Sequence, residues 1–130
     1  MRRIALCALL CPILLSAAGA KTQKERQTQP CEERGSQAEA SGCAHQEYVA
    51  ADAELNKVYN QLAAKQDEAG RAKLKAAEVS WLKYRDDNCD YEASMYEGGS
   101  IKPTIKNTCL ERMTKARTAE LRGQIKDLDN

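Results

Sequence analysis

The sequence predicts an all-α fold, a small antiparallel bundle of three to four helices stapled by two disulfides. Apolar residues recur at spacings of three and four along three long segments, which is the pattern of amphipathic helices. No segment alternates between apolar and polar residues as a half-buried strand would. Four of the six cysteines follow an N-terminal targeting signal, so the exported chain carries an even number.

Residues 1–20 have the three parts of a secretory signal peptide. Residues 1–3 are basic, residues 4–15 form an apolar run, and residues 18–20 supply an Ala-Gly-Ala cleavage signal. The apolar run is too short to span a bilayer comfortably and no second run follows, so no membrane span is expected. Neither Cys7 nor Cys11 follows the small residue that lipoprotein processing needs. We therefore expect a periplasmic or secreted protein.

This interpretation divides the chain into a signal peptide at residues 1–20, a disordered leader at residues 21–30 and one helical domain at residues 31–130. The leader is polar, charged and without periodicity. The whole chain has 20 Lys and Arg against 19 Asp and Glu, and loss of Arg2 and Arg3 with the signal leaves 18 against 19, a formal net charge of −1. That balance provides no electrostatic basis for nucleic-acid binding.

The cysteines of the mature chain are Cys31, Cys43, Cys89 and Cys109, and we expect them to form two disulfides. Four cysteines allow three pairings. We favour Cys31–Cys43 and Cys89–Cys109, because each pair brackets a break between helical segments. A metal site would need closely spaced Cys and His ligands, and His45 is the single histidine, so neither a metal nor another cofactor is expected.

The first helical region begins at Ser36, because Ser36 and Glu39 match the S-x-x-E capping box. We expect a short helical turn there, a break at residues 41–42, and a longer helix from residue 44 to about residue 65. A glycine stop signal at residues 67–70 ends it. Its buried face is expected to hold Tyr48, Ala51, Leu55, Val58, Tyr59 and Leu62.

The second long helix is expected from about residue 71 to residue 91 or 95, and the third from about residue 104 to residue 126. Turn residues 98–103 separate them. Trp81, the one Trp, is expected to be a core residue. The predicted buried stripe of the second helix consists of Leu74, Ala77, Trp81 and Tyr84, widened by Val79 and Leu82. The third helix is expected to bury Ile105, Cys109, Leu110, Met113, Ala116, Leu121, Ile125 and Leu128.

No set of residues indicates catalysis. Asp86 and Asp87 are neighbours that point in different directions on a helix, so we interpret them as solvated charges rather than an acid–base pair. His45 is expected at the surface, and every mature Cys is assigned to a disulfide and is no nucleophile. The turn at residues 98–100 lacks the Gly-Lys-Ser/Thr of a phosphate loop. The sequence therefore does not predict an enzyme.

Asp52, Arg85 and Arg117 lie on or beside the apolar stripes of three different predicted helices. A carboxylate and two guanidinium groups in such places would need one another as partners. We predict that Asp52 pairs with at least one of the two arginines across the helix interface. Three independent surface charges are the alternative that the pattern leaves open.

The order and spacing of a larger set of residues resemble one known family. The set is Cys43-Ala44, Tyr48, Ala51-Asp52, Glu54-Leu55-Asn56, Tyr59, Trp81-Leu82, Tyr84-Arg85-Asp86, Cys89, Gly98-Gly99-Ser100-Ile101, Pro103, Cys109, Thr114, Arg117-Thr118 and Glu120-Leu121. It is similar to the N-terminal domain of LprI-type lysozyme inhibitors, which are exported helical domains of bacteria. The resemblance extends from Cys31 to about Leu121.

The resemblance implies an exported binding protein whose protein partner is lysozyme, inhibited by occlusion of the enzyme's cleft. The namesake of the family is a lipoprotein, whereas this chain lacks the signal Cys that such an anchor needs. The alternative is a periplasmic structural or envelope-stress interaction domain with an unrelated partner, and no oligomeric state is implied. We assign structural roles to Tyr48, Asp52, Leu55, Tyr59, Trp81, Tyr84, Arg85 and Arg117.

Overall fold

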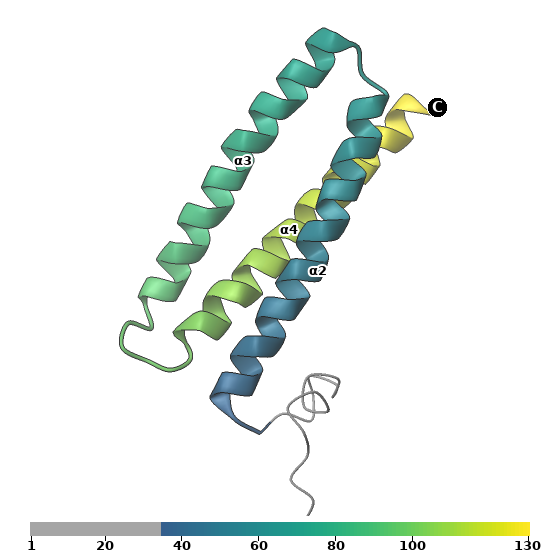
Figure 1. Cartoon of the computed structure of the whole chain (residues 1–130). Helices are drawn as coiled ribbons and strands as arrows, with labels where there is room; N and C mark the ends of the chain where they lie inside the picture. The colour runs from purple at the N-terminus through teal and green to yellow at the C-terminus, as the bar shows by residue number, and fades with distance from the viewer. Residues whose placement is uncertain (1–34) are drawn as a thin grey trace, which may run out of the picture.

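The computed structural model describes residues 35–130, which form three helices and no strand. Helix α2 spans Gln37–Ala64, α3 spans Glu68–Ser94 and α4 spans Lys102–Leu128. Successive helices run in opposite directions, so the chain passes up, down and up through an antiparallel bundle (Figure 1). The all-α prediction is confirmed for this part of the chain. The predicted signal peptide, the predicted leader and Cys31 lie outside the described residues.

Helix α2 is continuous from Gln37, and the break expected at residues 41–42 is wrong. The predicted capping box is present: the Ser36 hydroxyl accepts from the Glu39 N–H, and the Glu39 carboxylate accepts from the Ser36 N–H. Gly42 lies inside α2, where a glycine costs about 1 kcal/mol of helix stability relative to alanine. Burial of the next two residues, Cys43 and Ala44, offsets this cost.

The two turns that join the helices contain the residues expected of them. The Asp67 carboxylate caps α3 by accepting from the Gly70 N–H at 2.7 Å, so α3 begins at Glu68 and not at residue 71. Between α3 and α4, Gly98 has a φ of 74°, a value that favours glycine. Pro103 lies in the first turn of α4, where a missing N–H costs nothing.

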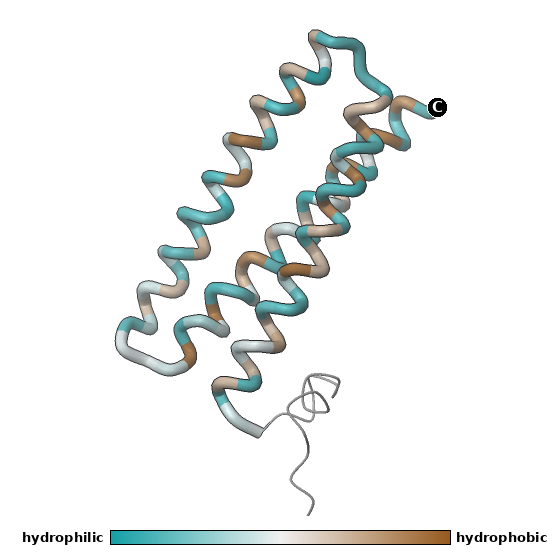
Figure 2. The backbone as a smooth tube through the Cα atoms, viewed as in Figure 1, coloured by the Kyte–Doolittle hydropathy of each residue, from teal (hydrophilic) through white to brown (hydrophobic). Residues whose placement is uncertain are grey.

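The main core lies between α2 and α4. Leu55, Val58 and Leu62 of α2 pack with Leu121 of α4, and each of the four is at most 3% exposed. In Figure 1, α4 follows α2 closely, whereas α3 lies apart from α2 over most of its length. Figure 2 shows hydrophobic residues recurring between hydrophilic ones along all three helices, as expected of amphipathic segments.

Helix α3 buries a different face from the one the sequence suggested. Its buried residues are Glu78, Arg85, Cys89 and Ala93. Tyr84 is 59% exposed and Val79 is 58% exposed, so their predicted places on a buried stripe are wrong, and Ala77 is also exposed. Trp81 is partly buried against the leucine core rather than enclosed by it. The helix is rotated because its two ion-paired side chains, Glu78 and Arg85, face the bundle together with Cys89 and Ala93.

A disulfide joins α3 to α4 through Cys89 and Cys109, which confirms this predicted pair. Both cysteines are buried and lie in a second core cluster with Leu110, against which Tyr48 and Met113 pack. Cys43 is also disulfide-bonded. Its predicted pairing with Cys31 stays a prediction, because Cys31 lies outside the described residues.

The α2–α4 core predicts a large difference between two leucines of α4. Leu121 has no exposed surface, so Leu121→Ala should lower the free energy of unfolding by about 2–5 kcal/mol. Leu128 is 55% exposed, and Leu128→Ala should change it by less than about 0.5 kcal/mol. Denaturant unfolding with the disulfides intact measures both, and equal losses would contradict this placement of the core.

Candidate functional site

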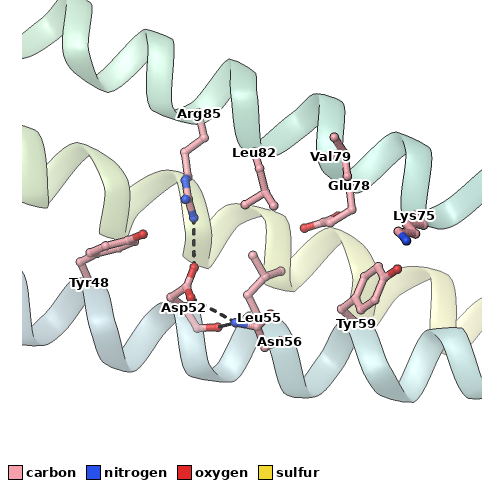
Figure 3. Close-up of a pocket in the computed structure, with 10 residues that line it drawn as sticks. All are labelled: Tyr48, Asp52, Leu55, Asn56, Tyr59, Lys75, Glu78, Val79, Leu82 and Arg85. Carbon is pink, nitrogen blue, oxygen red and sulfur yellow. Dashed lines mark hydrogen bonds and ion pairs between the residues drawn. The ribbon is translucent and has the colours of Figure 1, made fainter.

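A groove with a volume of about 370 Å³ runs between α2 and α3. It exists because both helices pack against α4 and touch each other little. Figure 3 shows Tyr48 and Tyr59 near its two ends, with Leu55 and Leu82 facing each other between them. Of the eight residues given structural roles from the sequence, five line this groove: Tyr48, Asp52, Leu55, Tyr59 and Arg85.

Asp52 and Arg85 join the two sides of the groove, as Figure 3 shows. Arg85 Nη1 donates to Asp52 Oδ1 at 3.1 Å, which confirms the predicted pairing of Asp52 with one of the arginines. The Arg85 side chain is 6% exposed, whereas that of Asp52 is 36% exposed. Asn56 Nδ2 donates to the second oxygen of Asp52 at 3.1 Å. Each oxygen of the Asp52 carboxylate therefore accepts a hydrogen bond, and the side chain still remains partly exposed to solvent.

Arg85 also reaches two further acceptors. Its Nη1 donates to the Thr114 hydroxyl of α4 at 3.2 Å, and its Nε donates to Asp86 Oδ1 at 2.9 Å. Burial lowers the pKa of Arg85, but its hydrogen bond to Asp86, its electrostatic interactions with Tyr48 and Asp86, and its hydrogen bond to Asp52 outweigh burial and raise the pKa. Arg85 therefore stays charged and links all three helices. Asp86, interpreted from the sequence as a solvated charge, is a partner of this arginine.

Arg117 pairs with Glu78 and not with Asp52. Arg117 Nε donates to Glu78 Oε2 at 3.0 Å, and the two side chains are 12% and 10% exposed. Arg117 Nη1 also donates to Glu120 at 3.0 Å. Sequence reasoning missed Glu78, because a glutamate between two apolar residues resembles a surface charge. Glu78 precedes Arg85 by seven residues and Cys89 by eleven, so all three lie on one face of the helix. This spacing could have identified Glu78 as a buried residue from the sequence.

Two guanidinium groups contact the ring of Trp81. The Cζ of Arg85 is 5.5 Å from the centroid of the Trp81 ring and that of Arg117 is 5.7 Å away. Arg85 also lies 5.4 Å from the ring centroid of Tyr48. Contacts of this kind are cation–π interactions, each worth about 0.5–2 kcal/mol depending on burial. Trp81 is thus held by two cations and by the leucine core. Tyr84 is outside this arrangement.

The other residues considered for catalysis, Asp87 and His45, lie at the surface. Asp87 pairs with Lys83 rather than with Asp86, and His45 is exposed. Residues 35–130 contain no group of three His, Cys, Asp or Glu side chains placed to hold a metal ion. None of the three described helices is long and apolar enough to cross a membrane. The described site is suited to holding helices together and to binding, and it contains no nucleophile with a neighbouring base.

The partial burial of Asp52 and Arg85 predicts measurable coupling between them. A double-mutant cycle with Asp52→Asn and Arg85→Met should give a coupling of about 1.5–3 kcal/mol, the range for a hydrogen bond to a charged group. The matched control is the cycle with Asp87→Asn and Lys83→Met, whose side chains are 64% and 77% exposed and should couple by about 0.5 kcal/mol or less. Coupling no larger than the control would mean that Asp52 and Arg85 act independently.

Comparison with known proteins places the chain in one family. The family described as "Lysozyme inhibitor LprI" matches residues 28–121, a range that includes all of α2 and α3 and most of α4. An uncharacterized protein of Rhizobium meliloti is 34% identical over an alignment 130 positions long. The alignment covers 90% of this chain and 94% of that protein. No solved structure matches the chain. The family match spans well over half of the sequence and includes every residue of the groove, and the chain belongs to the LprI family of lysozyme inhibitors.

Proposed function

We propose that this protein is exported to the periplasm or beyond and inhibits a lysozyme by occluding the cleft of the enzyme. The observation that carries the proposal is the family match over residues 28–121, which contains the whole charge network of Asp52, Glu78, Arg85 and Arg117. The LprI family is an inhibitor family, so the role is binding without a reaction of the protein's own.

The architecture supports such a role because an inhibitor gains affinity from a surface that is already in its bound shape. Three helices of 27 or 28 residues are fixed by the α2–α4 core, by buried ion pairs and by the Cys89–Cys109 disulfide. These constraints order the groove-lining side chains before any partner arrives. Little conformational entropy would then be lost when the groove meets an enzyme.

A second candidate is a structural or envelope-stress interaction domain with an unrelated protein partner. The observation that favours it is an exposed apolar face on the outer side of α3. Tyr84, Tyr91 and Met95 are 59%, 67% and 64% exposed and follow one another at spacings of seven and four residues. Apolar side chains gathered on one helix face are typical of protein-binding surfaces, and this face lies away from the groove.

A lysozyme turnover assay with purified mature protein tests the proposal. The disulfide-intact protein should reduce the rate of cell-wall hydrolysis in a saturable way. When the enzyme concentration exceeds the dissociation constant, inhibition should be complete near one molecule of this protein per molecule of enzyme. The same protein after reduction and alkylation is the matched control. A panel of animal and bacterial lysozymes should contain at least one inhibited enzyme. Full activity of every lysozyme at a large excess of this protein would contradict the proposed function.

A further inference from the structure

We propose that the groove between α2 and α3 binds a cationic side chain, Lys or Arg, presented by the partner protein. The inference rests on the proposed function only in naming lysozyme as that partner; the chemistry of the groove stands on the structure alone. Two observations carry it, namely an unpartnered buried carboxylate oxygen and the apolar walls beside it.

The unpartnered oxygen belongs to Glu78. Oε2 of this carboxylate accepts from Arg117, whereas Oε1 is buried and has no hydrogen-bond partner anywhere in residues 35–130. Glu78 is 8% exposed, and Figure 3 shows its carboxylate pointing into the groove toward Leu55 and Leu82. A buried acceptor without a donor costs about 1–3 kcal/mol, and more when it is charged. A ligand that brings an N–H to Oε1 recovers that free energy.

The two carboxylates that line the groove favour a charged donor over a neutral one. The lining is balanced overall, with Asp52 and Glu78 against Lys75 and Arg85, so this preference comes from the carboxylate oxygens themselves and not from net charge. Glu78 is the carboxylate that has an oxygen without a donor. Charge-assisted hydrogen bonds are about twice as strong as neutral ones.

The walls of the groove suit the long apolar stem of Lys or Arg. Leu55 from α2 and Leu82 and Val79 from α3 supply aliphatic surface, and Tyr59 supplies an aromatic ring at one end. Long cationic side chains bury their methylene groups on such surfaces and keep the charged head on a polar group. The half-exposed Asp52 carboxylate is the first acceptor an entering cation meets. Because Glu78 Oε1 is buried, the final contact requires a neighbouring side chain to move aside.

Titration followed by amide NMR of the mature protein tests this chemistry without lysozyme. The probe is N-acetyl-argininamide, and its matched neutral control is N-acetyl-citrullinamide, which has nearly the same shape and no charge. Amides of groove residues should shift in a saturable way with the arginine probe, and at least about tenfold more weakly with the citrulline control. No localised shift with the arginine probe, or equal shifts with both, would overturn the proposal.

A pair of lysine substitutions on α3 provides the variant and its control. Val79 lines the groove and is 58% exposed, so Val79→Lys adds a positive charge there without disturbing the core. Ala76 is exposed on the same helix and is not part of the groove, so Ala76→Lys adds the same charge elsewhere. Val79→Lys should weaken binding of the arginine probe about tenfold by like-charge repulsion, and Ala76→Lys should leave it unchanged. Equal behaviour of the two variants would overturn the assignment of the site.

The same two variants separate failure of this inference from failure of the proposed function. If wild-type protein inhibits lysozyme, Val79→Lys should raise the inhibitor concentration needed by about tenfold or more, and Ala76→Lys should not. Undiminished inhibition by Val79→Lys would overturn the groove as the lysozyme-binding surface and leave the proposed function intact. Absence of inhibition by the wild type would contradict the proposed function, and the titration with the arginine probe would still decide the cation site.

Discussion

The stack of Arg85, Trp81 and Arg117 is the interaction on which the position of α3 depends. Helix α3 fully buries only two apolar residues, Cys89 and Ala93, and partly buries Leu74 and Trp81 against the leucine core, so the hydrophobic effect alone holds it weakly. Two guanidinium groups against one indole ring, each tied to carboxylates, supply the remaining contacts along its middle. The Cys89–Cys109 disulfide anchors the C-terminal half of the same helix. The N-terminal half of α3 relies on the stack and on the packing of Leu74 against the leucine core.

This arrangement explains why the bundle has a groove. Helices α2 and α4 share a leucine core, and α3 rests on α4 through the Arg117–Glu78 pair and the disulfide. The reach of Arg85 to Asp52 and Tyr48, and the packing of Trp81 against the leucine core, connect α3 to α2. Buried ion pairs contribute less to stability than well-packed apolar residues of the same volume, but they fix register and spacing. The network therefore holds α3 at a distance at which its charged face and α2 enclose an open space lined by polar acceptors.

The sequence predicted the parts of this structure that follow from local patterns. The capping box at Ser36, the turn that contains Gly98 and the Cys89–Cys109 disulfide all follow from local residue chemistry and are confirmed, except that α4 already begins at Lys102, inside the predicted turn. The pairing of Asp52 with Arg85 was predictable because a charged residue on an apolar stripe needs a partner. Continuity of α2 through Gly42 was not, because burial of the following residues outweighs the glycine penalty.

The face of α3 shows why a candidate site can be missed. Periodicity of apolar residues selected Ala77, Val79 and Tyr84, and all three are exposed. The true face carries Glu78 and Arg85, whose burial becomes favourable only once Arg117 and Asp52 from other helices are present. A hydrophobic pattern contains no information about such partners, because they come from positions far away in the sequence. The groove, which depends on the spacing of two helices, is likewise a property of the assembled bundle.

Residue-resolved hydrogen exchange is the most direct test of the claim that the arginine–tryptophan stack holds α3. Mid-helix amides of α2 and α4 should exchange only by global unfolding, whereas those in the first half of α3, residues 68–82, should open at a lower free energy. Arg85→Met should lower protection further in that half of α3 while amides near the disulfide lose less. Equal protection of all three helices in the wild type, or a loss spread evenly over them in the variant, would contradict the account.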